Sequence, residues 1–216
     1  EGMLYATVVR PPAFGQKIKS FDASKAKEVN GVLDVFQFGD KLKAIEKQAQ
    51  GFTRVTDKIA IVATSTWAAL KAQKALSVEW EDVKLESTAD HDQLLTAILD
   101  GKDLEVRRED GNVNRAFANA EKVIERTYHA PFLPHNCLEP MNFYADVKAD
   151  HIHLVGPTQT PAWAQGMIAA AYNMKPEQIT IEMTRMGGGF GRRLYNDFLL
   201  EAAEVSSIIQ KPVKVV

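Results

Sequence analysis

The first 85 residues alternate short apolar segments with polar ones, which predicts a compact α+β unit. Strands are predicted where β-branched and apolar residues cluster, at 3–9 (MLYATVV), 32–38 (VLDVFQF), 58–63 (KIAIVA) and 77–80 (SVEW). Helical spacing predicts a helix that Ser65 caps and that ends near Leu76. Shorter helices are expected after Asp22 or Ser24 and at 41–50.

Residues 86–119 change in character and predict a charged connector. They include the run DGKDLEVRREDGNVNR and a short amphipathic helix expected at 90–99. An exposed connector fits this polarity, and a docking segment for a partner subunit is the alternative.

Residues 120–216 return to a strand and helix pattern. Strands are expected at 122–128, 142–148, 151–155, 179–183 and 213–216, the second and third of them forming a hairpin. Thr160 and Pro161 predict a helix start, and Asn196 or Asp197 predicts another. The last strand stops without a turn, so we expect this chain to be a piece of a longer protein.

Charge and composition exclude several classes of protein. Lys and Arg number 26 and Asp and Glu 28, a net charge of −2, which argues against a protein that coats nucleic acid. No apolar run reaches the length of a membrane span. The single cysteine, Cys137, excludes an intramolecular disulfide and any metal site built from cysteines alone.

The sequence GGGFGRR at 187–193 lies between a predicted strand and a predicted helix. Four of the residues at 187–191 are glycine, so the backbone can adopt positive φ and approach a ligand closely. The next helix would present free N–H groups, and Arg192 and Arg193 add positive charge. This combination predicts an anion or phosphate cradle, with a tight turn that binds nothing as the alternative. It lacks the Gly-Lys-Ser/Thr of a Walker loop, and Leu194 breaks the dinucleotide fingerprint.

A second loop, GPTQTP at 156–161, also joins a predicted strand to a predicted helix. If its strand and the one before GGGFGRR belong to one sheet, the two loops lie at the same sheet edge, where α/β units bind ligands. The carboxamide of Gln159 could donate to an oxygen or accept from an N–H. A side chain that only stabilises its own turn is the alternative.

A third segment, HNCLEP at 135–140, contains His135, Cys137 and Glu139. The set is too small for a structural zinc site, and no accompanying ligand motif is present. A structural glutamate and a cysteine that fills apolar space are the favoured interpretation. His151 and His153 are expected at the surface.

Taken in order, these motifs resemble the molybdenum-binding large subunit of the xanthine oxidase family of molybdenum hydroxylases. The similarity is to the branch of isoquinoline 1-oxidoreductase β-subunits and aldehyde dehydrogenases. It is carried by MLYATVVRPP, KIAIVATSTWAALKAQKAL, HNCLEPMNFYADV and GPTQTPAWAQGMIAAAYNMKPEQITIEMTRMGGGFGRR. The pairing of the glutamine loop with GGGFG at this spacing is its most specific part.

The resemblance implies an α/β-hammerhead domain at 1–85 and the first, truncated part of a molybdopterin-binding α+β domain at 120–216. It implies a molybdenum–molybdopterin cofactor, in a cytosine dinucleotide form. Gln159 would hydrogen-bond an oxo ligand, and Phe190-Gly191 would lie against the metal. The residues that we expect to bind the cofactor are Gln159, Gly188, Gly189, Phe190, Gly191 and Arg192.

The resemblance also implies hydroxylation of an N-heteroaromatic or an aldehyde with oxygen from water. The implied partners are a small subunit with 2Fe–2S clusters and a cytochrome c that accepts electrons. The implied compartment is the periplasm. Purine-oxidising members carry Gly-Gly-Lys-Glu after the phenylalanine, whereas Leu194 replaces that glutamate here, which disfavours a purine. The family's general base would lie beyond residue 216, so we expect the isolated chain to be inactive. A non-catalytic phosphate- or nucleotide-binding module built on GGGFGRR is the alternative function.

Overall fold

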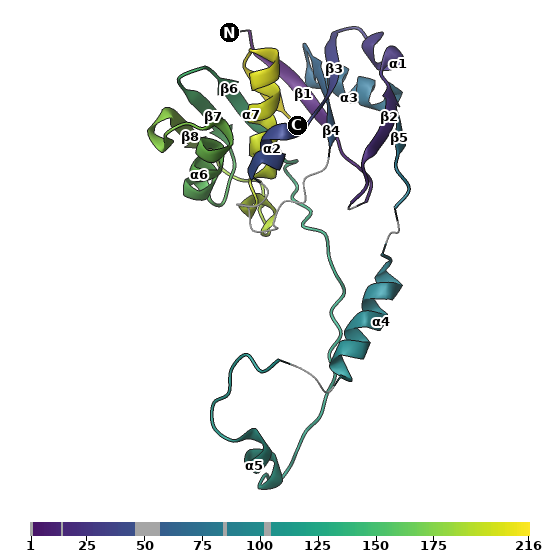
Figure 1. Ribbon diagram of the computed structural model, residues 1–216, viewed down its shortest axis with the longest axis vertical. Helices are drawn as coiled ribbons and strands as arrows, with labels where there is room; N and C mark the ends of the chain where they lie inside the picture. The colour runs from purple at the N-terminus through teal and green to yellow at the C-terminus, as the bar shows by residue number, and fades with distance from the viewer. Residues whose placement is uncertain (1, 14, 46–56, 84–85, 102–104) are drawn as a thin grey trace. The chain divides into compact units, whose positions relative to one another are not determined.

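The computed structural model describes the chain except for residues 1, 14, 46–56, 84–85 and 102–104 (Figure 1). The chain forms two compact units. One contains residues 1–83 together with 135–216, and the other contains residues 84–134.

A mixed seven-stranded sheet forms the centre of the first unit. In spatial order its strands are β3 (Val32–Phe38), β4 (Lys58–Ala63), β1 (Leu4–Val9), β9 (Val213–Val215), β6 (Phe143–Val147), β7 (Ile152–Gly156) and β8 (Ile179–Met183). Strand β1 pairs in parallel with β9, so strands from both predicted domains belong to one sheet. The division at residues 85 and 119 stays a prediction.

Helices pack on this sheet and bury its apolar side chains. They are α1 (Ser24–Lys27), α3 (Thr66–Ala75), α6 (Pro161–Tyr172) and α7 (Asp197–Ile209). Helix α2 (Asp40–Ile45) packs on α6 and α7, and η1 (Pro176–Gln178) and η2 (Arg192–Leu194) are short 3-10 turns. Helix α7 packs on β6 and β9, and the rings of Phe143 and Phe198 meet there with centroids 5.7 Å apart. The unit is therefore a mixed α/β fold, as predicted.

Most predicted elements of the first unit are confirmed, and two details are corrected. Ser65 caps α3 by accepting from the Ala68 N–H at 3.2 Å. Thr160 does not cap α6 with its side chain, because its hydroxyl donates to the Leu194 carbonyl instead. The sequence pattern also missed β2 (Ile18–Asp22), which pairs with β5 (Ser77–Trp80) in a separate two-stranded sheet. The predicted helix at 41–50 is seen as α2, and its second half lies outside the described residues.

The second unit contains α4 (Thr88–Leu99) and α5 (Val113–Ala118), and none of its described residues is buried. The predicted amphipathic helix at 90–99 is confirmed as α4, which a capping box between Ser87 and Asp90 begins. The predicted strand at 122–128 is wrong. That segment pairs with no strand in the described chain, and Ile124 is exposed. Its apolar residues therefore have neither a partner strand nor a core to pack against.

Within the described ranges, none of the helices combines the length and the apolar composition that crossing a bilayer requires.

The end of β7 gives a test of the packing. A Cβ added at Gly156 would lie 2.5 Å from the ring of the fully buried Phe143. We expect Gly156→Ala to lower the free energy of unfolding by about 1–3 kcal/mol, because a buried ring has little room to move. Gly166→Ala is the matched control, since nothing lies within 4 Å of its added Cβ. Urea denaturation should show Gly166→Ala unchanged or more stable, and equal midpoints for both variants would contradict the packing argument.

Candidate functional site

Two loops leave the same edge of the sheet. Strands β7 and β8 are parallel neighbours, and Gly156 at the end of β7 pairs with Met183 at the end of β8. Helix α6 connects them, so the polypeptide returns to the same side before β8 begins. The expectation that these two strands share a sheet is confirmed, and the loops at 157–160 and 184–191 begin side by side.

Glycine at position 189 allows the two loops to touch. A Cβ added at Gly189 would lie 2.6 Å from Oε1 of Gln159, closer than any real contact permits. Gln159 is itself exposed, and its N–H donates to the Arg193 carbonyl at 3.2 Å. The structure therefore brings together the carboxamide and the glycine-rich backbone that the sequence singled out separately.

The backbone of the glycine-rich loop follows an unusual path. Gly188 and Gly191 have φ of +105° and +84°, which favour glycine, and Phe190 has φ of +48° with its ring 72% exposed. In the described part of the chain, the N–H groups of residues 188–191 have no hydrogen-bond acceptor. They are left for solvent or for a ligand with acceptor atoms.

The segment containing His135, Cys137 and Glu139 lies against this loop. Cys137 Sγ is 3.4 Å from the Gly189 carbonyl oxygen, and the Glu139 carboxylate accepts the Gly187 N–H at 2.8 Å. Among the residues that the structure describes, no three His, Cys, Asp or Glu side chains are grouped as metal ligands. The side chains of Cys137 and Glu139 therefore lie against the glycine-rich loop.

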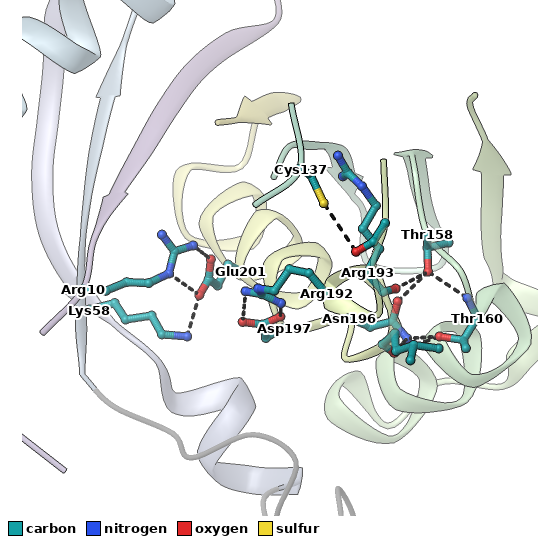
Figure 2. Close-up of polar contacts among 12 residues, drawn as sticks. Arg10, Lys58, Cys137, Thr158, Thr160, Arg192, Arg193, Asn196, Asp197 and Glu201 are labelled. Carbon is teal, nitrogen blue, oxygen red and sulfur yellow. Dashed lines mark hydrogen bonds and ion pairs between the residues drawn. The ribbon is translucent and has the colours of Figure 1, made fainter. Parts of the chain in front are cut away.

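The two arginines have different environments. The Arg192 guanidinium makes a two-pronged ion pair with Asp197, at 2.7 and 2.9 Å (Figure 2). Burial disfavours the Asp197 carboxylate, but the hydrogen bonds and charge of Arg192 outweigh it and lower the pKa of Asp197. Arg193 is fully buried and donates to the Gly188 carbonyl and to Glu139. Neither guanidinium lies free at the surface.

Helix α7 begins at Asp197, as predicted, and η2 lies between the glycine-rich loop and this helix. The side chain of Asn196 does not cap α7. It accepts from the Thr158 hydroxyl at 2.7 Å and donates to Thr160 Oγ1 at 2.8 Å, which ties α7 to the glutamine loop (Figure 2).

Sequence reasoning missed the supporting contacts of Thr158, Glu139 and Asn196. The motif HNCLEP was noticed, but nothing in its spacing indicates that it contacts the glycine-rich loop, which lies about fifty residues further along the chain. Only the pairing of β6 with β7 and of β7 with β8 brings those segments together.

Comparison with known proteins gives consistent matches. Residues 97–216 match the family described as the molybdopterin cofactor-binding domain. The chain is 29% identical to a membrane-bound aldehyde dehydrogenase (pyrroloquinoline-quinone) of Gluconacetobacter polyoxogenes, with 100% of the chain and 27% of the relative aligned. It is 28% identical to the isoquinoline 1-oxidoreductase subunit beta of Brevundimonas diminuta, again over 100% of the chain and 27% of the relative. The chain therefore spans about a quarter of the length of these relatives.

A solved structure shows the same fold. Quinoline 2-oxidoreductase of Pseudomonas putida 86 superposes with a TM-score of 0.69 at 21% identity, covering 100% of this chain and 31% of that one.

The Arg192–Asp197 pair predicts a pH dependence of stability. At pH 7 we expect Asp197→Asn to lower the free energy of unfolding by about 1–3 kcal/mol, because the variant loses charged hydrogen bonds. The folded-state pKa of Asp197 is below its unfolded value, so the stabilisation is complete above about pH 4 and is lost as the pH falls through the folded pKa.

Denaturant titrations at pH values from 7 to 3 should therefore show that the difference in free energy of unfolding between the parent and Asp197→Asn becomes smaller as the pH falls. Asp34→Asn is the control, because the Lys27–Asp34 pair is more than half exposed and contributes little. A difference that stays constant down to the lowest pH would show that the ion pair is not its source.

Proposed function

Because the chain belongs to the molybdopterin cofactor-binding domain family of molybdenum hydroxylases, we propose that its full-length protein oxidises an aldehyde or an N-heteroaromatic compound at a molybdenum cofactor. The observation that carries this proposal is the contact between the Gly189 backbone and the Gln159 carboxamide at the shared edge of β7 and β8. Relatives named for aldehydes and for isoquinoline support the two substrate classes.

The residues at this edge fit such a group. A molybdopterin cofactor brings its own sulfur ligands, so the protein must supply space and hydrogen-bond donors more than metal ligands. The absence of a Cβ at Gly189 lets the Gln159 carboxamide lie against the loop, and the N–H groups of residues 188–191 give the donors. When bound, the cofactor would supply two-electron oxidation with oxygen from water.

Each of the predicted site residues then has a role toward the cofactor. Gln159 would bind it through the carboxamide, and Gly188, Gly189 and Gly191 would hold it through their backbone. The exposed ring of Phe190 would form a wall of the site. Arg192 would act indirectly, because its guanidinium is bound to Asp197 and only its long-range charge reaches an anionic group.

The wider organisation is part of the same proposal. We assign residues 1–85 to a hammerhead-like domain and the cofactor to a cytosine dinucleotide form. Electrons would pass to 2Fe–2S clusters on a small partner subunit, with a cytochrome c as a further acceptor. A relative named as a subunit beta supports a multi-subunit enzyme. The proposal places the family's general base outside the residues described here, and on that basis we propose that the isolated 216-residue chain is inactive.

Elemental analysis of the full-length protein, with turnover assays on isoquinoline and on aldehydes, tests the proposal. We expect molybdenum in the purified protein and oxidation of at least one substrate. One relative is named for pyrroloquinoline quinone, so the quinone should be measured in the same samples. Quinone without molybdenum, or phosphate binding without turnover, would contradict the proposed function and favour another cofactor or a binding module.

Gly189→Val in the full-length protein should give a folded protein that lacks molybdenum. The new side chain would clash with the Gln159 carboxamide. The loop backbone has little freedom to shift away, because the elements at both of its ends hold it. Gly166→Val is the control, because its side chain meets open space on α6. Metal content and circular dichroism should be measured together; normal molybdenum loading of Gly189→Val would mean that the loop is only a turn.

Gln159→Ala should keep the fold and the cofactor but reduce the rate. Removing one positioned donor from a reacting centre typically lowers kcat by about 100–1000-fold. Because the carboxamide is exposed and its side chain makes no hydrogen bond to the residues that the structure describes, stability should hardly change. Steady-state kinetics on molybdenum-replete protein would decide, and an unchanged kcat would remove Gln159 from the site.

A further inference from the structure

Arg193 is the most deeply buried cation beside the glycine-rich loop, with no exposed surface. Its Nε donates to the Gly188 carbonyl at 2.8 Å. Its Nη2 donates to the Glu139 carbonyl at 2.9 Å and to Glu139 Oε2 at 3.1 Å. A buried guanidinium is costly unless it is paired in this way, so these bonds fix it in one position.

Glu139 binds the loop at a second point. Its Oε2 accepts the Gly187 N–H at 2.8 Å, and its own N–H donates to the Gly187 carbonyl at 3.2 Å. Burial opposes ionisation of this carboxyl group, but the bonds from Gly187 and Asn142 and the charge of Arg193 lower the pKa of Glu139. The lowered pKa therefore favours the carboxylate form of Glu139 at neutral pH.

The direction of one peptide group follows from these contacts. In a trans peptide the C=O and the N–H point in opposite directions. Because Arg193 holds the Gly188 carbonyl toward the protein, the N–H of Gly189 faces away from Arg193, and it has no acceptor in the described chain.

From this geometry we propose that Arg193, braced by Glu139, is a positioning residue that shapes the glycine-rich loop and directs its free N–H groups to the cofactor. This inference rests on the proposed function for the identity of the cofactor. Arg193 acts through the backbone and does not itself contact the cofactor.

The energetics of Arg193 fit a role in geometry more than in stability. Its Nη1 is buried without a partner among the described residues, which carries a desolvation penalty. Replacing a buried ion pair by groups of similar shape is often neutral for stability. Removing both charges should consequently leave the fold intact and change the loop.

The test compares three variants of the full-length protein. The double variant Arg193→Met with Glu139→Gln, called the clamp variant, removes both members of the Arg193–Glu139 ion pair and so leaves no unpaired charge. The amide oxygen introduced at position 139 can still accept the Gly187 N–H. Arg193→Lys keeps a donor at the same place. Lys58→Met is the control, because it removes another buried ion pair, at 2.6 Å, whose side chains make no bond to residues 187–191, and Glu201 keeps Arg10 as its partner.

Molybdenum content and hydrogen exchange of the loop peptides are measured for each. We expect the clamp variant to lose molybdenum about 10- to 100-fold, as is typical when groups that orient a metal site are removed. Its loop amides should exchange several-fold faster. The lysine variant should lose clearly less molybdenum than the clamp variant, since a donor is retained, and the control should match the parent in both readouts.

Parent-like molybdenum and exchange in the clamp variant would overturn the inference, as would equal losses in the control or in Arg193→Lys. If the parent itself contains no molybdenum, the proposed function fails. In that case the exchange rates alone decide whether Arg193 shapes the loop.

Discussion

The parallel pairing of β7 with β8 is the constraint on which the site depends. Its register places the ends of the two strands level, and the Thr184 N–H donates to the Gly156 carbonyl just beyond them. A shift of one residue would turn every side chain of a strand to the other face and expose Ile152 or Ile179, which are buried. Burial of the strands therefore also fixes where the two loops begin.

Buried charges then hold the surrounding elements in place. Glu201 on α7 is fully buried and binds Arg10, which follows β1, and Lys58 on β4 (Figure 2). The chain from the first strands is thus tied to α7. Because breaking such a pair leaves an uncompensated buried charge, each partner depends strongly on the other. These ion pairs select one arrangement more than they add net stability.

The glycine-rich loop is hydrogen-bonded to the protein at Gly187 and Gly188, and most of its backbone N–H groups have no acceptor in the described chain. Glu139 and Arg193 satisfy one N–H and two carbonyls of the loop, whereas the N–H groups of residues 188–191 stay unbonded within the described chain. A loop built in this way is ordered before a ligand arrives, so binding does not have to fix its backbone. Glycine is needed at positions 188 and 191 because the backbone has a positive φ there.

The amino-acid pattern determined the local elements and the candidate chemistry of this protein. The apolar segments at 58–63 and 179–183 gave strands, Ser65 a helix start, and the glycines at 187–191 a loop that can approach a ligand, because each depends on a few neighbouring residues. The segment at 122–128 had the same local pattern and formed no strand, since pairing needs a partner that sequence cannot supply. Only the tertiary structure decided that Gln159 touches Gly189, that Arg192 is bound by Asp197, and that Glu139 and Arg193 meet behind the loop. These contacts join residues 5 to 54 positions apart, and sheet register and burial, which no local pattern encodes, bring them together.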